Sequence, residues 1–395
     1  MVDVTVPLGI YVSVPFCKAK CTYCNFASGV HAAARMDEYV ERLCGEIRGS
    51  RRQAGRLGAT LPDTVDTVFF GGGTPSLLSP EHFQSIFTAL RGEFSVAQDA
   101  EITIECAPGQ MPEATLEWLL ALGMSRISFG VQSFVDQESR AVGRLHTGAQ
   151  CIDEVARMHR SGIDRVNVDL IAGLPHQTRE SWRYSLQQAV ETEASHVSVY
   201  MLEVDEDSRL GRELIGEGVR YGAGLVPDES QIASMYTEAC ESLGEAGIAQ
   251  YEISNFSRKG EESRHNLKYW HRDPYLGFGL DAHSMLLDRN SNAVRFANCD
   301  DLDTYLINVP VEGENIDSAA AFEEAVFLGL RLNRGISVLQ LREDFSEALI
   351  DPFLHQVQQM QIAGMVQRDG DTICLTNEGR LLSNTVFTEL FSVPA

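Results

Sequence analysis

The sequence predicts an α/β protein built on a parallel sheet, followed by a smaller, mainly helical domain. From residue 9 to about residue 200, short β-branched runs alternate with amphipathic stretches, and from about residue 316 consecutive helices take over. Length points the same way. The chain has 395 residues, and a single hydrophobic core stops growing at roughly 250–300 residues. We therefore expect one large α/β unit and a smaller second one.

Six strands separated by five helices are expected in the first half, which is the pattern of parallel βαβ units. The strands are predicted at residues 9–14, 65–70, 101–106, 126–131, 165–171 and 196–201. The helices between them are predicted at residues 36–54, 80–90, 112–122, 149–160 and 178–190. Such a sheet either opens flat or curls toward a barrel, and in both cases functional groups gather at the carboxyl ends of the strands.

The second half is predicted to begin with a loop and to end in a small helical unit. Residues 203–227 are rich in glycine and acidic residues and are predicted to be a loop, with a helix after them at 228–245. The last part is expected to contain helices at 318–332, 338–345, 351–363 and 378–390, with a hairpin at 365–376 that turns at Gly370.

Helices combined with such a hairpin resemble a winged helix, a fold that often binds DNA. The hairpin region, however, carries Asp369, Asp371 and Glu378 against Arg368 and Arg380, which is no basic stripe. We therefore expect a lid or docking module.

Charge and hydropathy exclude several classes of partner. Lys and Arg total 32 against 56 Asp and Glu, which gives a net charge of −24. A surface this acidic repels phosphate backbones and anionic lipids, so no nucleic-acid partner is expected. No apolar run approaches the ~20 residues that span a bilayer, and the first residues have no basic stretch of a signal peptide. We expect a cytoplasmic protein without an integral membrane segment.

Three of the nine cysteines lie close together, directly after the first predicted strand. Cys17, Cys21 and Cys24 form a C-x3-C-x2-C pattern. A zinc site usually takes four ligands, whereas a [4Fe–4S] cluster uses one thiolate per iron, so three cysteines would leave one iron open to a ligand. A degenerate zinc knuckle or a chance spacing is the alternative, which the position after a strand disfavours. The other cysteines are expected in the core: Cys44, Cys106, Cys151, Cys240, Cys299 and Cys374.

Residues 11–24, which read YVSVPFCKAKCTYC, resemble the radical S-adenosylmethionine (SAM) superfamily, in particular its branch of oxygen-independent coproporphyrinogen III oxidases. The resemblance implies a partial (β/α)6 barrel in residues 1–205, a barrel extension in 206–310 and a winged-helix-like domain in 311–395. It also implies one [4Fe–4S] cluster held by the three cysteines, S-adenosyl-L-methionine as cofactor, and an electron donor. In this family, electron transfer from the reduced cluster breaks a C–S bond of the cofactor.

The same resemblance assigns residues to the organic cofactor. Gly72, Gly73 and Thr74 match the glycine motif of the family, and glycine lets the backbone approach a ligand closely. Tyr11 and Tyr23 flank the cluster loop, with core packing as the alternative. The remaining matches are polar residues at or after strand ends: Glu105, Gln132, Arg144 and Asp169. The two carboxylates suit the cationic and ribose groups, the guanidinium suits the carboxylate, and the amide suits the ribose.

One position separates two branches of the family. The oxidases continue their motif as C-x3-C-x2-C-x-C, but Phe26 stands at the last cysteine position here. Phenylalanine cannot replace a thiol, so decarboxylation of coproporphyrinogen is in doubt and no catalytic residue is assigned. Phe26 instead resembles the sister group of haem chaperones. A coproporphyrinogen oxidase or another radical enzyme remains the alternative, and a DNA-binding iron–sulfur regulator is opposed by the net charge.

A second motif also resembles the haem chaperones. His265, Asn266, Tyr269 and Trp270 match their H-N-x-x-Y-W pattern, within a segment that continues into the glycine-rich residues 277–284. Imidazole is a common haem-iron ligand, and aromatic rings offer flat faces to a macrocycle. The alternative is that the histidine and asparagine brace a loop while the aromatic rings are core. His271 and His283 are further candidate ligands. The implied partners are haem as cargo and an acceptor apo-haemoprotein.

Overall fold

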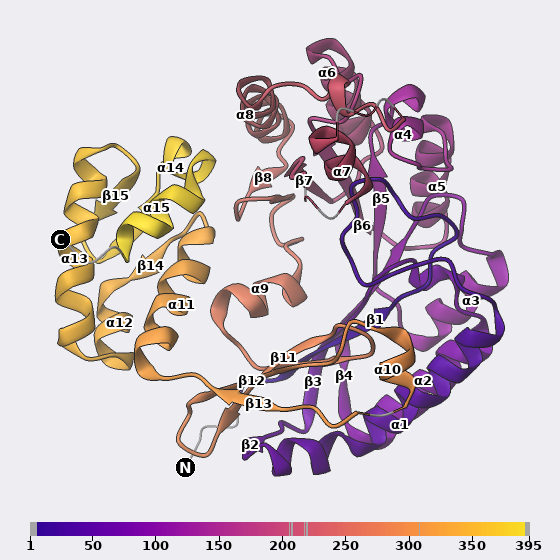
Figure 1. Cartoon of the computed structure of the whole chain (residues 1–395), viewed down its shortest axis with the longest axis horizontal. Helices are drawn as coiled ribbons and strands as arrows, with labels where there is room; N and C mark the ends of the chain where they lie inside the picture. Colours follow the sequence, from indigo (N-terminus) through magenta and orange to yellow (C-terminus); the bar gives the residue numbers. More distant parts are fainter. Residues whose placement is uncertain are drawn as a thin grey trace.

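The computed structural model describes residues 6–391 with the exception of residues 205, 207, 217, 219 and 308. In this part of the chain, six parallel strands lie side by side in chain order. They are β1 (Leu8–Val14), β3 (Thr64–Gly72), β4 (Ser95–Cys106), β5 (Arg126–Gln132), β6 (Arg165–Ala172) and β7 (His196–Met201). The sheet curves strongly without closing (Figure 1), which confirms the predicted partial barrel.

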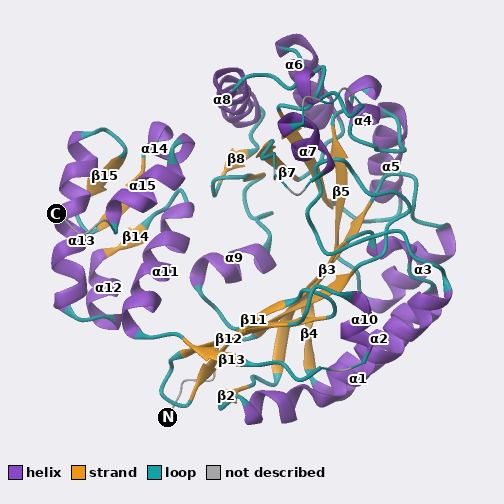
Figure 2. Ribbon diagram, in the orientation of Figure 1, coloured by secondary structure: helices purple, strands orange, loops and turns teal. Residues whose placement is uncertain are grey.

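Helices cover the convex outer face of the sheet (Figure 2). They are α1 (Ala34–Arg56), α2 (Pro80–Glu93), α3 (Glu113–Leu122), α5 (Gly148–Arg160) and α6 (Arg179–Glu191). Ser79, Thr147 and Thr178 begin three of them as N-caps, each accepting from the backbone N–H three residues on. A short helix that the sequence pattern did not predict, α4 (Asp136–Ala141), follows β5.

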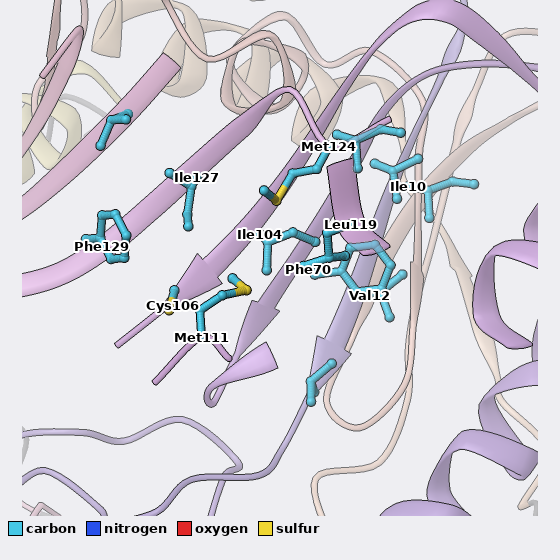
Figure 3. Packing of buried hydrophobic residues seen from close by; sticks show 14 of the residues in the cluster. Ile10, Val12, Phe70, Ile104, Cys106, Met111, Leu119, Met124, Ile127 and Phe129 are labelled. Atoms are coloured by element: carbon cyan, nitrogen blue, oxygen red, sulfur yellow. The ribbon is translucent and has the colours of Figure 1, made fainter. Parts of the chain in front are cut away.

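The outward side chains of the strands form the main core against these helices. Ile104 and Phe129 are fully buried, and Figure 3 shows Ile104 beside Leu119 of α3, with Phe129 farther along the same layer beyond Ile127. Cys106 also lies in this layer, as expected for a small core residue. Truncating Ile104 or Phe129 to alanine is expected to cost roughly 2–5 kcal/mol of folding free energy. Because side chains alternate across a strand, the neighbouring residues point into the lumen of the barrel, where the site lies.

After β7 the chain extends both edges of the sheet. The elements near the β7 edge are α7 (Arg209–Ile215), η2 (Ala223–Leu225), α8 (Glu229–Glu245), β8 (Ala249–Gln250) and β9 (Asn255–Ser257). The chain then passes through α9 (Arg264–His271) to the β1 edge, where β10 (Tyr275–Phe278) pairs in parallel with β1. The edge continues with β11 (His283–Asp288), β12 (Ala293–Ala297) and β13 (Gly313–Asn315); β2 (Ala59–Thr60) pairs with β11, and α10 (Leu302–Leu306) follows β12. The extension thus shares one sheet with the barrel.

The predicted loop at 203–227 was wrong in part, because it contains α7 and η2. Ser208 begins α7 by accepting a hydrogen bond of 2.9 Å from the backbone N–H of Gly211. A helix of two turns within a glycine-rich segment is too short to produce a clear 3.6-residue periodicity.

The C-terminal unit has its own core and its own small sheet. It contains α11 (Ser318–Arg331), β14 (Ile336–Ser337), α12 (Val338–Asp344), α13 (Glu347–Ile362), β15 (Val366–Asp369), β16 (Thr372–Leu375), α14 (Asn377–Leu381) and α15 (Ser383–Leu390). Phe322, Val326 and Phe353 are buried in its core. The hairpin turns at Gly370, as predicted, whereas the last helix is divided at Leu382. No helix in the described residues is long and apolar enough to cross a membrane.

Candidate functional site

A cavity of about 610 Å³ lies at the carboxyl ends of the parallel strands. Every residue assigned to the cluster or to S-adenosylmethionine lines it except Tyr11: Cys17, Cys21, Tyr23, Cys24, Gly72, Gly73, Thr74, Glu105, Gln132, Arg144 and Asp169. They come from the loop after β1 and from β3, β4, β5 and β6 or the segments that follow these strands. The fold thus brings together groups that are more than 150 residues apart in the sequence.

The loop that carries the three cysteines is tied at its base. The Cys17 N–H donates to the carbonyl of Gly29, and the Gly29 N–H donates to the carbonyl of Pro15, both at 2.9 Å. Phe16 anchors this base as a fully buried ring, edge-on to Tyr39 at 5.3 Å. The three thiols are all partly exposed.

The three thiols suit an iron–sulfur cluster better than a single ion. Among the described residues, no three His, Cys, Asp or Glu side chains are grouped closely enough for one metal ion. Three soft sulfur donors that share a cavity without meeting at one point fit a cluster of several irons. Burial raises the pKa of Cys24, and a bound cationic centre would favour its thiolate instead.

The glycine motif after β3 is required by close backbone packing. The Gly73 N–H donates to the Val14 carbonyl, and the Thr74 N–H donates to the Phe16 carbonyl, both at 2.8 Å. A Cβ atom on Gly73 would lie 2.7 Å from the Phe16 carbonyl oxygen. Gly72 has a φ of +99°, which side chains rarely tolerate. The glycines therefore hold the end of β3 against the start of the cluster loop.

Arg144 is the principal cation of the cavity wall. It donates from Nη1 to the Cys21 sulfur at 3.3 Å and from Nη2 to the Gly130 carbonyl. Its Nε atom is buried without a hydrogen-bond partner. A buried guanidinium with an unused donor fits an incoming carboxylate.

Gln132 ends β5 in a strained conformation. Its φ is +69°, and the pairing of β5 with β6 shifts register between Gly130 and Gln132. A non-glycine residue in the left-handed region costs of order 1–3 kcal/mol and is typical of ligand-binding sites. The bulge directs this side chain to the cavity wall.

Two acidic side chains, Glu105 and Asp169, line the same cavity. Burial raises the pKa of Glu105 to about 8, and the negative charge of Asp169 adds to this effect. Burial also raises the pKa of Asp169, although it accepts hydrogen bonds from Asn167 at 2.7 Å and from Ser128 at 3.4 Å. Such a pair favours a ligand with ammonium or sulfonium groups, which would stabilise both charges.

The two tyrosines assigned to the cofactor, Tyr11 and Tyr23, lie at different depths in the barrel. Tyr23 lines the cofactor cavity, where burial raises its pKa. Tyr11 points into a second cavity, of about 210 Å³, deeper in the barrel lumen. There its ring stacks on Phe69 with 6.0 Å between centroids.

Helix α9 places His265 in the same deeper layer. The imidazole is 1% exposed, and it contacts Thr67 Oγ1 through Nδ1 and Tyr269 OH through Nε2, both at 2.9 Å. Burial lowers the pKa of His265 to about 3. On the same helix, the Lys268 ammonium pairs with Asp66 at 2.8 Å.

Asn266 lines the deeper cavity, while Trp270 lies toward the C-terminal unit, with Arg331 above its ring at 4.5 Å. Such contacts are those expected if the motif residues brace the fold instead of binding haem. Ligation of haem iron by His265 stays a prediction.

The deeper cavity also contains polar residues that we did not single out from the sequence. His196 contacts Asn167 Oδ1 through Nδ1 at 2.6 Å and Tyr251 OH through Nε2 at 2.9 Å. The sequence did contain a sign of these residues, because three strands of the barrel have polar residues at every second position. These pairs are Thr103 and Glu105, Asn167 and Asp169, and His196 and Ser198. Strands of a parallel sheet buried on both faces usually read as continuous apolar runs, so this alternation indicates a polar lumen.

Comparison with known proteins agrees with this geometry. Residues 11–189 match the Radical SAM superfamily and residues 316–382 match the HemN C-terminal domain. The chain is 31% identical over 384 residues to "Heme chaperone HemW" of Bacillus subtilis, covering 95% of this chain and 97% of that protein. It is 32% identical over 397 residues to "Heme chaperone HemW" of Mycobacterium tuberculosis, covering 97% and 95%.

Among solved structures, the coproporphyrinogen III oxidase HemN of Escherichia coli, a radical SAM enzyme, superposes with a TM-score of 0.83. The superposition covers 98% of this chain and 90% of that chain at 23% identity, and it shows a shared fold.

Proposed function

The chain belongs to the radical SAM superfamily and, within it, to the HemW family, and from this we propose that it binds haem and passes it to apo-haemoproteins. The proposal includes a [4Fe–4S] cluster and S-adenosyl-L-methionine bound in the cofactor cavity. The relatives named as haem chaperones match it over nearly their whole length.

The observation that carries the proposal is Phe26. Its side chain stands where the oxidases of the family carry a further cysteine, and it lines the cofactor cavity while remaining 59% exposed. A phenyl ring can neither donate a proton nor take part in thiol chemistry. An exposed apolar ring at the mouth of a cofactor cavity suits contact with a flat apolar cargo.

Different residues of the cavity would bind the cluster and S-adenosylmethionine. Cys17, Cys21 and Cys24 would hold the cluster, and the unused Nε donor of Arg144 would take the carboxylate of S-adenosylmethionine. Glu105 and Asp169 would receive its cationic and ribose groups, which relieves their mutual repulsion. When bound and reduced, the cluster supplies electrons to the cofactor. Arg144 also donates to Cys21, so it would connect the two cofactors.

The experiment is a pair of parallel assays on protein reconstituted anaerobically with its cluster. One assay follows haem binding, and the other follows protoporphyrinogen formation from coproporphyrinogen III with S-adenosylmethionine and reductant supplied. We expect haem binding and no protoporphyrinogen. Robust turnover of coproporphyrinogen by the unmodified protein would replace the proposal with an oxidase function.

A second variant tests whether Phe26 alone separates the two functions. Phe26→Cys is expected to form no protoporphyrinogen, because a decarboxylase must also orient the propionates of its substrate, and orientation is a large part of any rate enhancement. The same assay with the Phe26→Ala protein is the control for loss of the ring. Turnover in the cysteine variant would show that the rest of the site already fits coproporphyrinogen.

A further inference from the structure

A third cavity, of about 360 Å³, lies beside the cofactor cavity and is called the side cavity below. It is enclosed by the start of the barrel, the cluster loop, α9 and the glycine-rich segment 277–284. Phe26 and Gly72 form part of its wall and also line the cofactor cavity. A ligand in the side cavity would therefore be a direct neighbour of the cofactors.

The walls of the side cavity are largely aromatic. Tyr269 and Tyr275 stand edge to face with 4.6 Å between ring centroids, and Tyr11 and Phe26 complete the set. Leu280 adds an aliphatic surface. Cavities of this size with flat apolar walls and few polar groups are typical sites for planar organic ligands.

The glycine-rich segment holds His283 at this cavity. A Cβ atom on Gly277 would lie 2.3 Å from the His283 carbonyl oxygen, and one on Gly279 would lie 2.2 Å from the Tyr39 hydroxyl. Asp281, two residues after Gly279 and two residues before His283, has a φ of +55°. A strained non-glycine residue in a turn made of close backbone contacts is typical of a functional segment. The turn places His283 at the first position of β11.

His283 and His265 differ in exposure and in hydrogen-bond partners, and both properties decide whether an imidazole is free to bind a metal. The His265 ring is buried, and both of its nitrogens have partners. The His283 side chain is 71% exposed and lines the side cavity. Among the described residues its imidazole makes no hydrogen bond, and its Nε2 lies 3.9 Å from Asp281 Oδ1. A carboxylate this close favours a cationic or metal-bound imidazole electrostatically, and a hydrogen bond between the two groups would orient the ring.

We propose that the side cavity is the haem site and that His283 ligates the haem iron, with Asp281 orienting the imidazole and Phe26 contacting the macrocycle. This inference rests on the proposed function, because it specifies where the cargo binds. Helix α9 then contributes Tyr269 to the cavity wall, and its His265 braces the barrel. Haem would lie beside the S-adenosylmethionine site and not within it.

The test is a haem titration of the full chain, reconstituted anaerobically with its cluster, followed by the Soret band. We expect His283→Ala to weaken haem binding about tenfold or more and to shift the Soret maximum, because an axial ligand is lost. Added free imidazole should restore the band position, which a merely structural role would not allow. His355→Ala, at an exposed histidine of α13, is the matched control and should titrate like the unmodified protein.

Three further outcomes decide the inference. Unchanged affinity and Soret position in His283→Ala would overturn it. Loss of the band in His265→Ala, with unchanged circular dichroism and cluster absorbance, would also overturn it and would assign the ligand to α9. If the unmodified protein takes up no haem at all, the proposed function itself fails.

Asp281→Asn is expected to weaken binding less than His283→Ala, because it removes only the orienting charge.

Discussion

The cofactor cavity and helix α9 both carry motif residues, but the charged and imidazole side chains of α9 have partners inside the protein, whereas the Nε1 atom of Trp270 is buried without one. In α9, His265 has a partner for each ring nitrogen and Lys268 is paired with Asp66. In the cavity, Arg144 keeps an unused buried donor and Glu105 faces a second carboxylate. Buried polar groups without partners are costly. The polar groups of the cavity are therefore suited to bind ligands, whereas His265 and Lys268 of α9 stabilise the fold.

The largest effect is expected from the cluster loop. Replacing Cys17, Cys21 or Cys24 by serine should each abolish the visible absorbance of the reconstituted [4Fe–4S] cluster, because each thiolate holds one iron. Cys374→Ser, in the distant β16, is the matched control and should keep the cluster. Loss of the cluster in the Cys374 variant would break the assignment of the cavity as its site.

A smaller effect is expected from the carboxylates of the cavity. Asp169→Ala and Glu105→Ala should each weaken binding of S-adenosylmethionine while iron content stays unchanged. Removing one charge-assisted hydrogen bond costs about 1.5–3 kcal/mol, roughly 10–100-fold in Kd. Isothermal titration of the reconstituted protein measures this, with Asp153→Ala in the exposed face of α5 as control. Unaltered affinity in both variants would mean that the two carboxylates serve only the fold.

Substitution of His265 in α9 is expected to change the stability of the fold and not the binding of S-adenosylmethionine. His265→Ala removes two buried hydrogen bonds and should lower the free energy of unfolding by about 1–3 kcal/mol. Urea unfolding followed by circular dichroism measures the change, and His355→Ala should leave it unaltered. If His265→Ala were as stable as the unmodified protein, the contrast between the two regions would disappear.

The free energy of unfolding should also depend on pH, because Glu105 in the cavity titrates differently in the folded and unfolded chain. An unfolded Glu105 loses its proton near 4.5, whereas the folded carboxyl holds it until about 8. Between these values the folded state binds more protons, so stability falls as pH rises, by at most about 1.4 kcal/mol per pH unit. Urea unfolding of cluster-loaded protein without S-adenosylmethionine measures the slope. Glu105→Gln should flatten it, and an equal slope in that variant would assign the titration to another group.

Most of the barrel could be predicted because strand and helix alternate regularly there. All six predicted parallel strands are present, and their ends differ from the prediction by at most two residues, apart from β4, which begins at Ser95 instead of residue 101. The strand-end rule also placed Glu105, Gln132 and Asp169 at one cavity. Short helices such as α4 and α7 were missed, because one or two turns give no periodicity.

The distinction between the histidines could not come from the sequence. The H-N-x-x-Y-W pattern gives no sign that His265 would find both Thr67 and Tyr269 inside the barrel. Those contacts depend on α9 crossing between the two edges of the sheet, where it also contacts α11 (Figure 1). Likewise, only the folded chain brings His283 beside Phe26, 257 residues earlier in the sequence.

The proposed function requires that the chain carries haem to other proteins. The most direct measurement mixes the haem-loaded, cluster-containing protein with an apo-haemoprotein and follows the absorbance spectrum and activity of the acceptor. We expect the acceptor to gain its haem spectrum and activity while the donor loses its own Soret band. An acceptor that stays in its apo form, with haem retained by this protein, would contradict it.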